Sequence, residues 1–186
     1  MNTLFIIGNG FDLNLDLKTS YKDFYEYYKK TPSTNEEIRK LKLDIEKDII
    51  NWSDLELALG NYTEEIEKAE EFEMIFEDLL DHLSKYLRFA EVKISERKNE
   101  ENKEKLIESI CYPEKFLLPG DRNPIANFIR GKYRHSNGNI IDVITFNYTR
   151  TLETLLNFNG EEQLLDLSNN IHLNSIEHIH GYIDEL

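Results

Sequence analysis

Side chains that could do chemistry gather in three short stretches of the chain. The first is a glycine turn that ends in an acid, Gly8–Asp12, the second is Thr145–Thr149 with Asn147 at its centre, and the third is His178–Gly181. Glycine lets the backbone approach a ligand closely, and the amide groups of such a turn can hold a phosphate. An asparagine amide can orient a water or a hydroxyl, and histidine exchanges protons near neutral pH.

Considered alone, the glycine turn is weak evidence for a nucleotide-binding site. Apolar residues Leu4–Ile7 lead directly into Gly8 and Gly10. This run predicts a strand that is covered on both faces, as in parallel α/β sheets, and that ends in a tight turn. The full dinucleotide-binding fingerprint has a third glycine where this chain has Leu13. A turn that simply ends a strand is therefore the alternative interpretation.

Each of the three polar stretches follows an apolar run. The second and third runs are Ile140–Phe146 and Ile176–Ile179, which read as strands. Ligands bind beyond the carboxyl ends of the strands in an open α/β sheet, so the three stretches meet in one crevice if these strands are parallel neighbours. We expect an α/β fold, a Rossmann-like, mostly parallel sheet. We also expect a large helical insertion between the first and second strands, at about residues 53–110.

Every candidate residue also has a purely structural interpretation. His180 can be a strand-end histidine that is satisfied by the backbone, Asn147 can cap the helix that follows it, and Asp12 can end a turn. His178 alternates with His180 and would face the same side of a strand, so either one can be the functional histidine. Two histidines without a third ligand are a weak metal signal, and no metal is predicted.

Composition narrows the class of protein. The chain has 186 residues, enough for one domain, and a net charge of −14, which argues against a general affinity for nucleic acid or for an anionic membrane. Cys111 is the only cysteine, which excludes an intramolecular disulfide and fits a reducing cytoplasm. It reads as a buried filler rather than as a nucleophile. No apolar run approaches the length of a membrane span.

Four ordered motifs carry a resemblance to a known family. They are GNGFDLNLDLKTSYKDF, which begins at Gly8, WSDLE at Trp52–Glu56, ITFNYTRTLE at Ile144–Glu153 and HIHG at His178–Gly181. The chain resembles the AbiH family of bacterial phage abortive-infection proteins. That family in turn is similar to a distant branch of the sirtuin-like NAD-binding domains.

The resemblance implies a role for each matching residue. Gly8 and Gly10 match the glycines of the dinucleotide turn, Asn147 matches the asparagine that contacts the nicotinamide-side ribose or its attacking water, and His180 matches the catalytic histidine. Asp12 stands where sirtuins commonly have serine, and it is expected to polarise the water or to pair with His180. The expected catalytic set is His180, Asn147 and Asp12, and the expected nucleotide-binding set is Gly8, Asn9, Gly10, Phe11, Thr145, Tyr148 and Gly181.

Several features depart from the sirtuin pattern. Asn9 replaces a small residue, and Thr149 stands where sirtuins have aspartate. A paired-cysteine zinc module is missing, so protein deacetylation is not expected. The related families continue with further strands after the histidine motif. We therefore expect residues 1–186 to be a single nucleotide-binding domain that is truncated at its C-terminus.

The resulting expectation is a cytoplasmic bacterial anti-phage protein that binds and hydrolyses NAD or a related nucleotide, with NAD as substrate or ligand. Its expected partners are a nucleotide, a phage-derived or host protein that acts as trigger, and possible further copies of itself, without nucleic acid or membrane. One alternative is a nucleotide-sensing or protein-interaction module of a defence system without turnover. Another is a purely structural interaction protein, and a nuclease is disfavoured by the charge.

Overall fold

The computed structural model describes residues 1–66, 68–98, 100–134, 138–181 and 183 of the chain. Its strands are β1 (Asn2–Ile7), β2 (Asn139–Thr145), β3 (Gln163–Asp166) and β4 (Ile171–His178). Its helices are α1 (Gly10–Asn14), α2 (Tyr21–Tyr28), α3 (Glu36–Lys47), α4 (Leu55–Tyr62), α5 (Ala69–Arg97), α6 (Glu100–Cys111), α7 (Pro119–Arg134) and α8 (Thr151–Leu156). All described elements between β1 and β2 are helical, in a segment where residues 67 and 99 lie outside the description.

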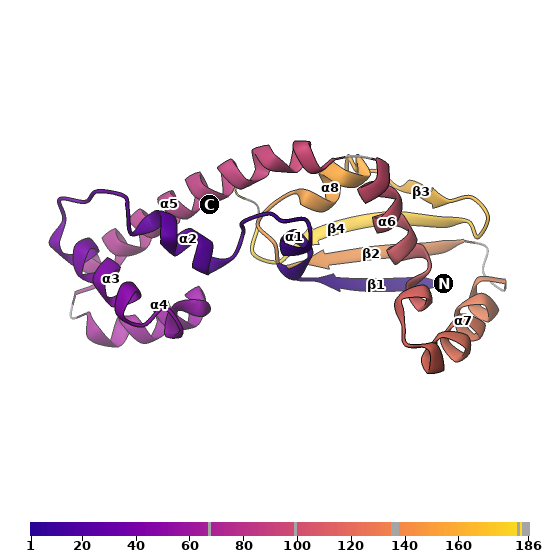
Figure 1. The fold of residues 1–186 in the computed structure, drawn as a ribbon, viewed down its shortest axis with the longest axis horizontal. Helices are drawn as coiled ribbons and strands as arrows, with labels where there is room; N and C mark the ends of the chain where they lie inside the picture. Colours follow the sequence, from indigo (N-terminus) through magenta and orange to yellow (C-terminus); the bar gives the residue numbers. More distant parts are fainter. Residues whose placement is uncertain (67, 99, 135–137, 182, 184–186) are drawn as a thin grey trace.

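The sheet is mostly parallel, as the sequence predicts. Its order is β1-β2-β4-β3, and β2 pairs in parallel with both β1 and β4 (Figure 1). The expected strands are therefore neighbours. Ile7 pairs with Thr145, which in turn pairs with His178, so the three strands end at the same level. Their carboxyl ends point toward α1 (Figure 1).

The sheet contains one strand, β3, that the sequence does not predict. β3 lies within the segment between α8 and β4, and it pairs antiparallel with the first half of β4. It has only four residues, and Leu164 is 44% exposed. A short edge strand of this kind has too little apolar alternation to stand out from a loop. β4 also begins at Ile171, earlier than expected.

The two faces of the sheet differ, which corrects one expectation. On one face Phe5, Val143 and Ile176 share a row and pack against α6 and α8 in one hydrophobic core. On the other face Leu4 and Ile6 of the edge strand β1 remain 55% and 68% exposed. The interpretation of the first strand as covered on both faces is therefore wrong, because the helices of the described part of the chain cover this sheet on one face.

A second hydrophobic core holds the helical part of the molecule together. Aromatic residues of α2, with Phe24, Tyr25 and Tyr28 fully buried, pack there against Trp52 and the first half of α5. This part lies beyond the carboxyl ends of the strands, and α5 runs from it toward the sheet (Figure 1). With 29 residues, α5 is about 44 Å long at about 1.5 Å per residue, enough to reach both parts. None of the described helices combines the length and apolar composition that crossing a membrane requires.

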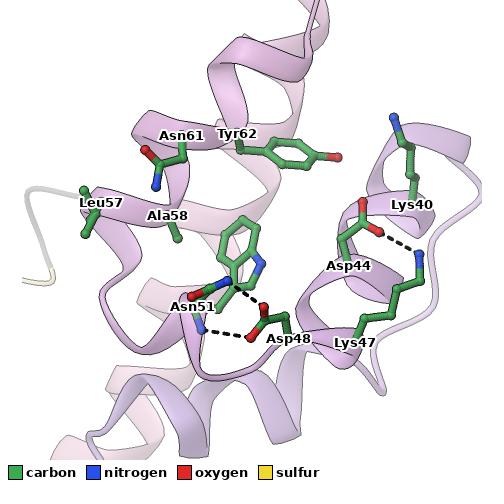
Figure 2. Close-up of a pocket in the computed structure, with 10 residues that line it drawn as sticks. Lys40, Asp44, Lys47, Asp48, Asn51, Leu57, Ala58, Asn61 and Tyr62 are labelled. Atoms are coloured by element: carbon green, nitrogen blue, oxygen red, sulfur yellow. Dashed lines mark hydrogen bonds and ion pairs between the residues drawn. The ribbon is translucent and has the colours of Figure 1, made fainter.

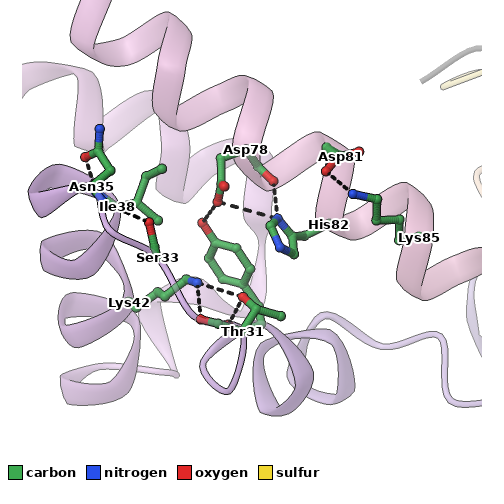
Figure 3. A network of polar contacts seen from close by, with 10 residues as sticks. Thr31, Ser33, Asn35, Ile38, Lys42, Asp78, Asp81, His82 and Lys85 are labelled. Carbon is green, nitrogen blue, oxygen red and sulfur yellow. Dashed lines mark hydrogen bonds and ion pairs between the residues drawn. The ribbon is translucent and has the colours of Figure 1, made fainter.

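A network of polar contacts joins α2, α3 and α5 inside the helical part (Figure 3). The Tyr28 hydroxyl donates to Asp78 Oδ2 at 2.7 Å. Burial and Asp78 raise the pKa of Tyr28 well above its usual range. The buried ammonium of Lys42 donates to the backbone oxygen and the hydroxyl of Thr31 at 2.8 and 2.7 Å, and it lies 4.3 Å from the centre of the Tyr28 ring. These bonds satisfy polar groups that would otherwise be costly to bury.

We expect Tyr28→Phe to lower the free energy of unfolding by about 1.5 kcal/mol, because it removes a hydrogen bond to a carboxylate from a fully buried position. Urea denaturation measures this loss. Lys85→Gln is the matched control, since it breaks the exposed Lys85–Asp81 pair on α5, the helix that carries Asp78, and we expect no measurable change from it. Equal midpoints for wild type and Tyr28→Phe would contradict this account of the network.

Candidate functional site

The three polar stretches meet at one edge of the sheet. The ladder hydrogen bonds continue just past the strands, where Phe146 N donates to Ile7 O and Ile179 N donates to Thr145 O, both at 3.0 Å. The residues that follow are held close together as a result. The fold thus brings the glycine turn, Asn147 and the histidine turn to one site, as the topology of parallel strands predicts.

A buried carboxylate stands at the centre of this site. Asp12 on α1 has no exposed surface, and its Oδ1 accepts from Asn147 Nδ2 at 3.1 Å. Its Oδ2 accepts from Thr149 Oγ1 at 2.5 Å, and the Thr149 hydroxyl also lies 2.9 Å from that of Thr151. Burial raises the pKa of Asp12 above its usual range, against the opposing effect of hydrogen bonds from these side chains. The sequence predicts Asp12 as a site residue but does not predict these hydrogen-bond partners.

Asn147 is oriented from two directions. Its backbone N–H donates to Thr145 Oγ1 at 3.1 Å while its amide nitrogen is held on Asp12. It does not cap the following helix, because α8 begins at Thr151 with Arg150 at its N-cap position. Asn147 is 5% exposed, and its Oδ1 has no hydrogen-bond partner among the described residues. Buried acceptors without partners are rare, so this oxygen marks Asn147 as a residue that would gain a hydrogen bond from a ligand or a water.

His178 is a buried structural histidine. Its Nδ1 lies 2.7 Å from the Asn147 carbonyl oxygen and its Nε2 lies 2.8 Å from Glu153 Oε1, while its side chain is 1% exposed. Both partners are acceptors, so a doubly protonated ring satisfies both contacts. Burial by itself lowers the pKa of His178, but the hydrogen bond and charge of Glu153 outweigh it and leave the pKa raised.

His180 is differently placed. β4 ends at His178, so His180 lies in the turn beyond the strand and the expected alternation on one face does not apply. Its ring centre is 5.6 Å from those of Phe146 and Tyr148. His180 is exposed and makes no hydrogen bond within the described part of the chain. Both of its ring nitrogens are consequently free to meet a ligand.

A cavity of about 210 Å³ opens at these residues. Five residues predicted from the sequence line it: Asn9, Asp12, Asn147, Tyr148 and His180. Leu83 and Leu87 of α5 supply an apolar wall, and Thr19 and Tyr21 reach it from the loop before α2 and from α2 itself. The Asn9 side chain fixes that loop, because it donates to Thr19 O at 3.1 Å and accepts from Thr19 Oγ1 at 2.6 Å.

The remaining predicted residues do not line this cavity. Gly8, Gly10 and Phe11 border a separate cavity of about 440 Å³. Apart from the adjoining chain, no atom of the described residues lies within 4 Å of where a Cβ would stand on Gly8 or Gly10, so the backbone there is open to a ligand. Thr145 is buried and serves as the acceptor for Asn147, and Gly181 occupies the turn after His180 with a φ of 75°.

Several members of the site are not evident from the sequence. Thr149, which differs from the aspartate of sirtuins, bonds directly to Asp12. Thr151 and Glu153 were not singled out at all. A signal was present in ITFNYTRTLE, because Thr149, Thr151 and Glu153 follow Asn147 at alternate positions. Only the fold, however, brings them to Asp12 and His178.

A larger cavity of about 580 Å³ lies in the helical part, between α3 and α4 (Figure 2). Lys40, Asp44, Trp52 and Tyr62 are among the residues that line it. Four of its polar side chains are engaged with one another, in the Lys47–Asp44 pair at 2.9 Å and the Asn51–Asp48 hydrogen bond at 2.5 Å. None of the residues predicted to do chemistry lines this cavity. Among the described residues, no group of three or more acids, histidines or cysteines could hold a metal ion.

We expect Glu153→Gln to destabilise the protein by about 2 kcal/mol at pH 6, because it replaces a charged hydrogen bond to a buried imidazolium. The pKa of His178 is raised in the folded state, so the stabilisation by Glu153 is fully present below the unfolded pKa of about 6.5. It is lost as the pH rises through the folded-state pKa. Urea unfolding of both proteins across this range measures the difference. A difference that grows with pH would contradict the ion pair.

Comparison with protein families identifies one match. Residues 4–186 match the family described as bacteriophage abortive infection AbiH. Comparisons with curated proteins and with solved structures find no match. The family match covers nearly the whole chain and includes all three polar stretches at the strand ends. It connects the chain to bacteriophage abortive infection, and the chain belongs to the AbiH family.

Proposed function

We propose that the strand-end cavity binds NAD or a related nucleotide and hydrolyses the bond between nicotinamide and ribose, as part of abortive infection. The observation that carries this proposal is the state of Asn147. Its amide nitrogen is fixed on Asp12 while its Oδ1, which belongs to a residue lining the cavity, has no partner among the described residues. A ribose hydroxyl or a water donating to Oδ1 would supply the missing hydrogen bond.

The size of the cavity suggests how the ligand lies. At about 210 Å³ it is smaller than the roughly 300–1,000 Å³ of most ligand pockets. It would therefore take one end of the dinucleotide, the nicotinamide with its ribose, next to the aromatic rings of Tyr148 and Phe146. The pyrophosphate would lie along the glycine turn, where Gly8 and Gly10 leave the backbone uncovered.

The proposed reaction needs a positioned water and a proton acceptor. The carbon–nitrogen bond to nicotinamide breaks with its electrons leaving on nicotinamide, through an oxocarbenium-like ribosyl state. A water oxygen then forms the new bond to the same ribose carbon, and its proton passes to His180. The products are nicotinamide and ADP-ribose. His180 suits this role because its ring nitrogens are unoccupied, whereas those of His178 are already bound.

Asp12 would act as a positioning residue in this scheme. It holds the Asn147 amide by one oxygen and Thr149 by the other. The amide thereby keeps its Oδ1 in a single orientation, which is what a group that positions substrate requires. His178 secures the same segment through the Asn147 carbonyl oxygen.

The second candidate is a nucleotide-sensing module without turnover. The observation in its favour is that α5 contacts both the cavity and the hydrophobic core of the helical part. Leu83 and Leu87 line the cavity, and the same two residues belong to the hydrophobic core of the helical part. A ligand in the cavity would therefore contact the element that packs against α2 and α3. Such a module would report occupancy through this helix rather than by chemistry.

Nicotinamide release from NAD, with thermal melting in the presence of NAD, tests both candidates. We expect Asn147→Ala to lower the rate of release by about 100-fold, because the water or ribose loses its positioning group. His172→Ala is the matched control, since His172 is bound to Glu162 and Asn170 away from the cavity, and its rate should equal that of wild type. Melting raised by NAD without release of nicotinamide would favour the sensing module instead. Neither effect in folded protein would reject both.

A further inference from the structure

A second candidate ligand site lies at the opposite end of the sheet. It is a cavity of about 560 Å³ between the turn Pro113–Phe116, helix α7 and the segment Ser168–Asn170 that precedes β4. It shares no lining residue with the strand-end cavity. In Figure 1, α7 lies beside the amino-terminal ends of the strands, away from α1. The volume falls within the usual range for pockets that hold a whole small ligand, about 300–1,000 Å³.

One wall of this cavity is formed by a buried carboxylate without a partner. Glu114 is 5% exposed, and its Oε2 is fully buried with no hydrogen-bond partner among the described residues. No side-chain hydrogen bond or ion pair of Glu114 occurs within the described part of the chain either. A buried carboxylate is costly unless donors satisfy it. Glu114 lines the cavity, and a rotation of its carboxyl group would bring this oxygen to N–H groups of a ligand.

Two arginines of α7 add positive charge to the lining of the same cavity. Arg122 and Arg130 both line it, and neither has a carboxylate partner among the described residues. Arg122 makes only a 3.4 Å contact with Leu117 O. Lys115 differs, because it is already paired with Glu108 at 2.5 Å. Unneutralised guanidinium groups in a protein with a net charge of −14 favour a bound anion, and arginine suits phosphate well.

Two tyrosine rings complete the lining. The Tyr112 hydroxyl donates to Asp166 at 2.7 Å and accepts from Asn169 at 3.0 Å, so its ring is held in place. Burial first, and the charge of Asp166 next to it, raise the pKa of Tyr112 to about 12. Tyr133 also lines the cavity, and burial raises its pKa to about 12 as well. Both rings therefore stay neutral near pH 7. Lys115 Nζ already lies 4.5 Å from the centre of the Tyr112 ring, so a planar base would stack on Tyr133 or on the opposite face of Tyr112.

A ligand that fits these groups must carry a phosphate, a flat ring and paired N–H donors. We propose that this cavity binds a guanosine phosphate, with Arg122 and Arg130 on the phosphate and Glu114 on the base. Guanine presents a ring N–H and an exocyclic amino group side by side, which match the two oxygens of one carboxylate. Adenine presents a ring acceptor at the corresponding edge and meets Glu114 with repulsion.

Calorimetric titration of the whole chain with guanosine 5′-monophosphate tests this site, with adenosine 5′-monophosphate as the competing probe. We expect guanosine monophosphate to bind at least about 10-fold more tightly than adenosine monophosphate, and Glu114→Gln to abolish that preference. Arg130→Ala should weaken both nucleotides by about 10-fold. Lys132→Ala is the control on the same helix, because Lys132 lies over Phe128 and does not line the cavity.

Three results would overturn the proposal: no binding of guanosine monophosphate to folded wild type, equal affinity for the two nucleotides, or an unchanged preference in Glu114→Gln. Glu114→Gln is nearly isosteric and removes an unpaired buried charge, and a thermal melt checks that it folds. If it does not fold, the exposed Arg122→Ala and Arg130→Ala variants still decide the phosphate contact. Nicotinamide release in the arginine variants should equal that of wild type, which separates this site from the strand-end cavity.

Discussion

Replacing Asp12 by asparagine should lower nicotinamide release by about 100-fold while leaving the protein as stable as wild type or more stable. The stability gain follows from burial. The pKa of Asp12 is raised in the folded state, so the charged form is less favourable there than in the unfolded chain. As the pH rises from the unfolded pKa of about 3.9 through the folded-state value, wild type loses stability, and the amide variant does not.

The expected loss of activity has a separate cause. An amide at position 12 can still accept from Asn147 and can donate to Thr149, so the local packing survives. It does not carry the charge that holds both donors in their present orientation. Positioning of Asn147 would weaken, and small displacements of a positioning group are costly for rate.

Urea unfolding at pH 7 and nicotinamide release measure the two effects of Asp12→Asn together. Asp142→Asn is the matched control, because Asp142 accepts from Asn174 and Ser175 on the partly exposed face of the sheet, away from the cavity. Its release rate should equal that of wild type. An Asp12→Asn protein that is clearly less stable yet fully active would show that Asp12 serves the fold alone.

Alanine substitutions of His178 and His180 should have very different effects on the stability of the protein. We expect His178→Ala to lower the free energy of unfolding by about 3–5 kcal/mol, because it leaves Glu153 partly buried without its cation and the Asn147 carbonyl without its donor. His180→Ala should change stability by less than about 0.5 kcal/mol, since His180 is exposed and unbonded among the described residues.

Denaturation of the two histidine variants at pH 6 measures the contrast directly. At this pH the raised pKa of His178 keeps the ion pair charged. Each alanine variant is the control for the other, because the positions differ by only two residues and lose the same side chain. Equal stability losses, or a larger loss for His180→Ala, would contradict the roles assigned from their surroundings.

The part of the fold that the sequence could predict is the part with strong local patterns. Apolar runs before Gly8, Asn147 and the histidine motif give three strands, and parallel neighbours follow from the α/β pattern. β3 was missed because four residues at an edge carry little periodicity. The exposure of Leu4 and Ile6 on one face of the sheet was not predicted. The run Leu4–Ile7 is uniformly apolar, and a uniform run does not show which side chains reach solvent.

For the candidate site, the sequence predicts the location but not the contacts between its residues. Its location was predictable because chain direction alone brings the ends of parallel strands together. Its internal contacts were not, since Asp12 and Thr149 are 137 residues apart in sequence and meet only through the pairing of β1 with β2. The different environments of His178 and His180 depend on where β4 ends, and helix and strand boundaries are the least certain part of a sequence-based prediction.

The central claim, that the strand-end cavity cleaves a nicotinamide nucleotide with His180 as proton acceptor, is tested most directly by nicotinamide release from NAD by the purified chain and its His180→Ala variant. We expect wild type to release nicotinamide and the variant to release it at least about 100-fold more slowly, with unchanged melting. No release by folded wild type, or equal rates in the two proteins, would contradict it.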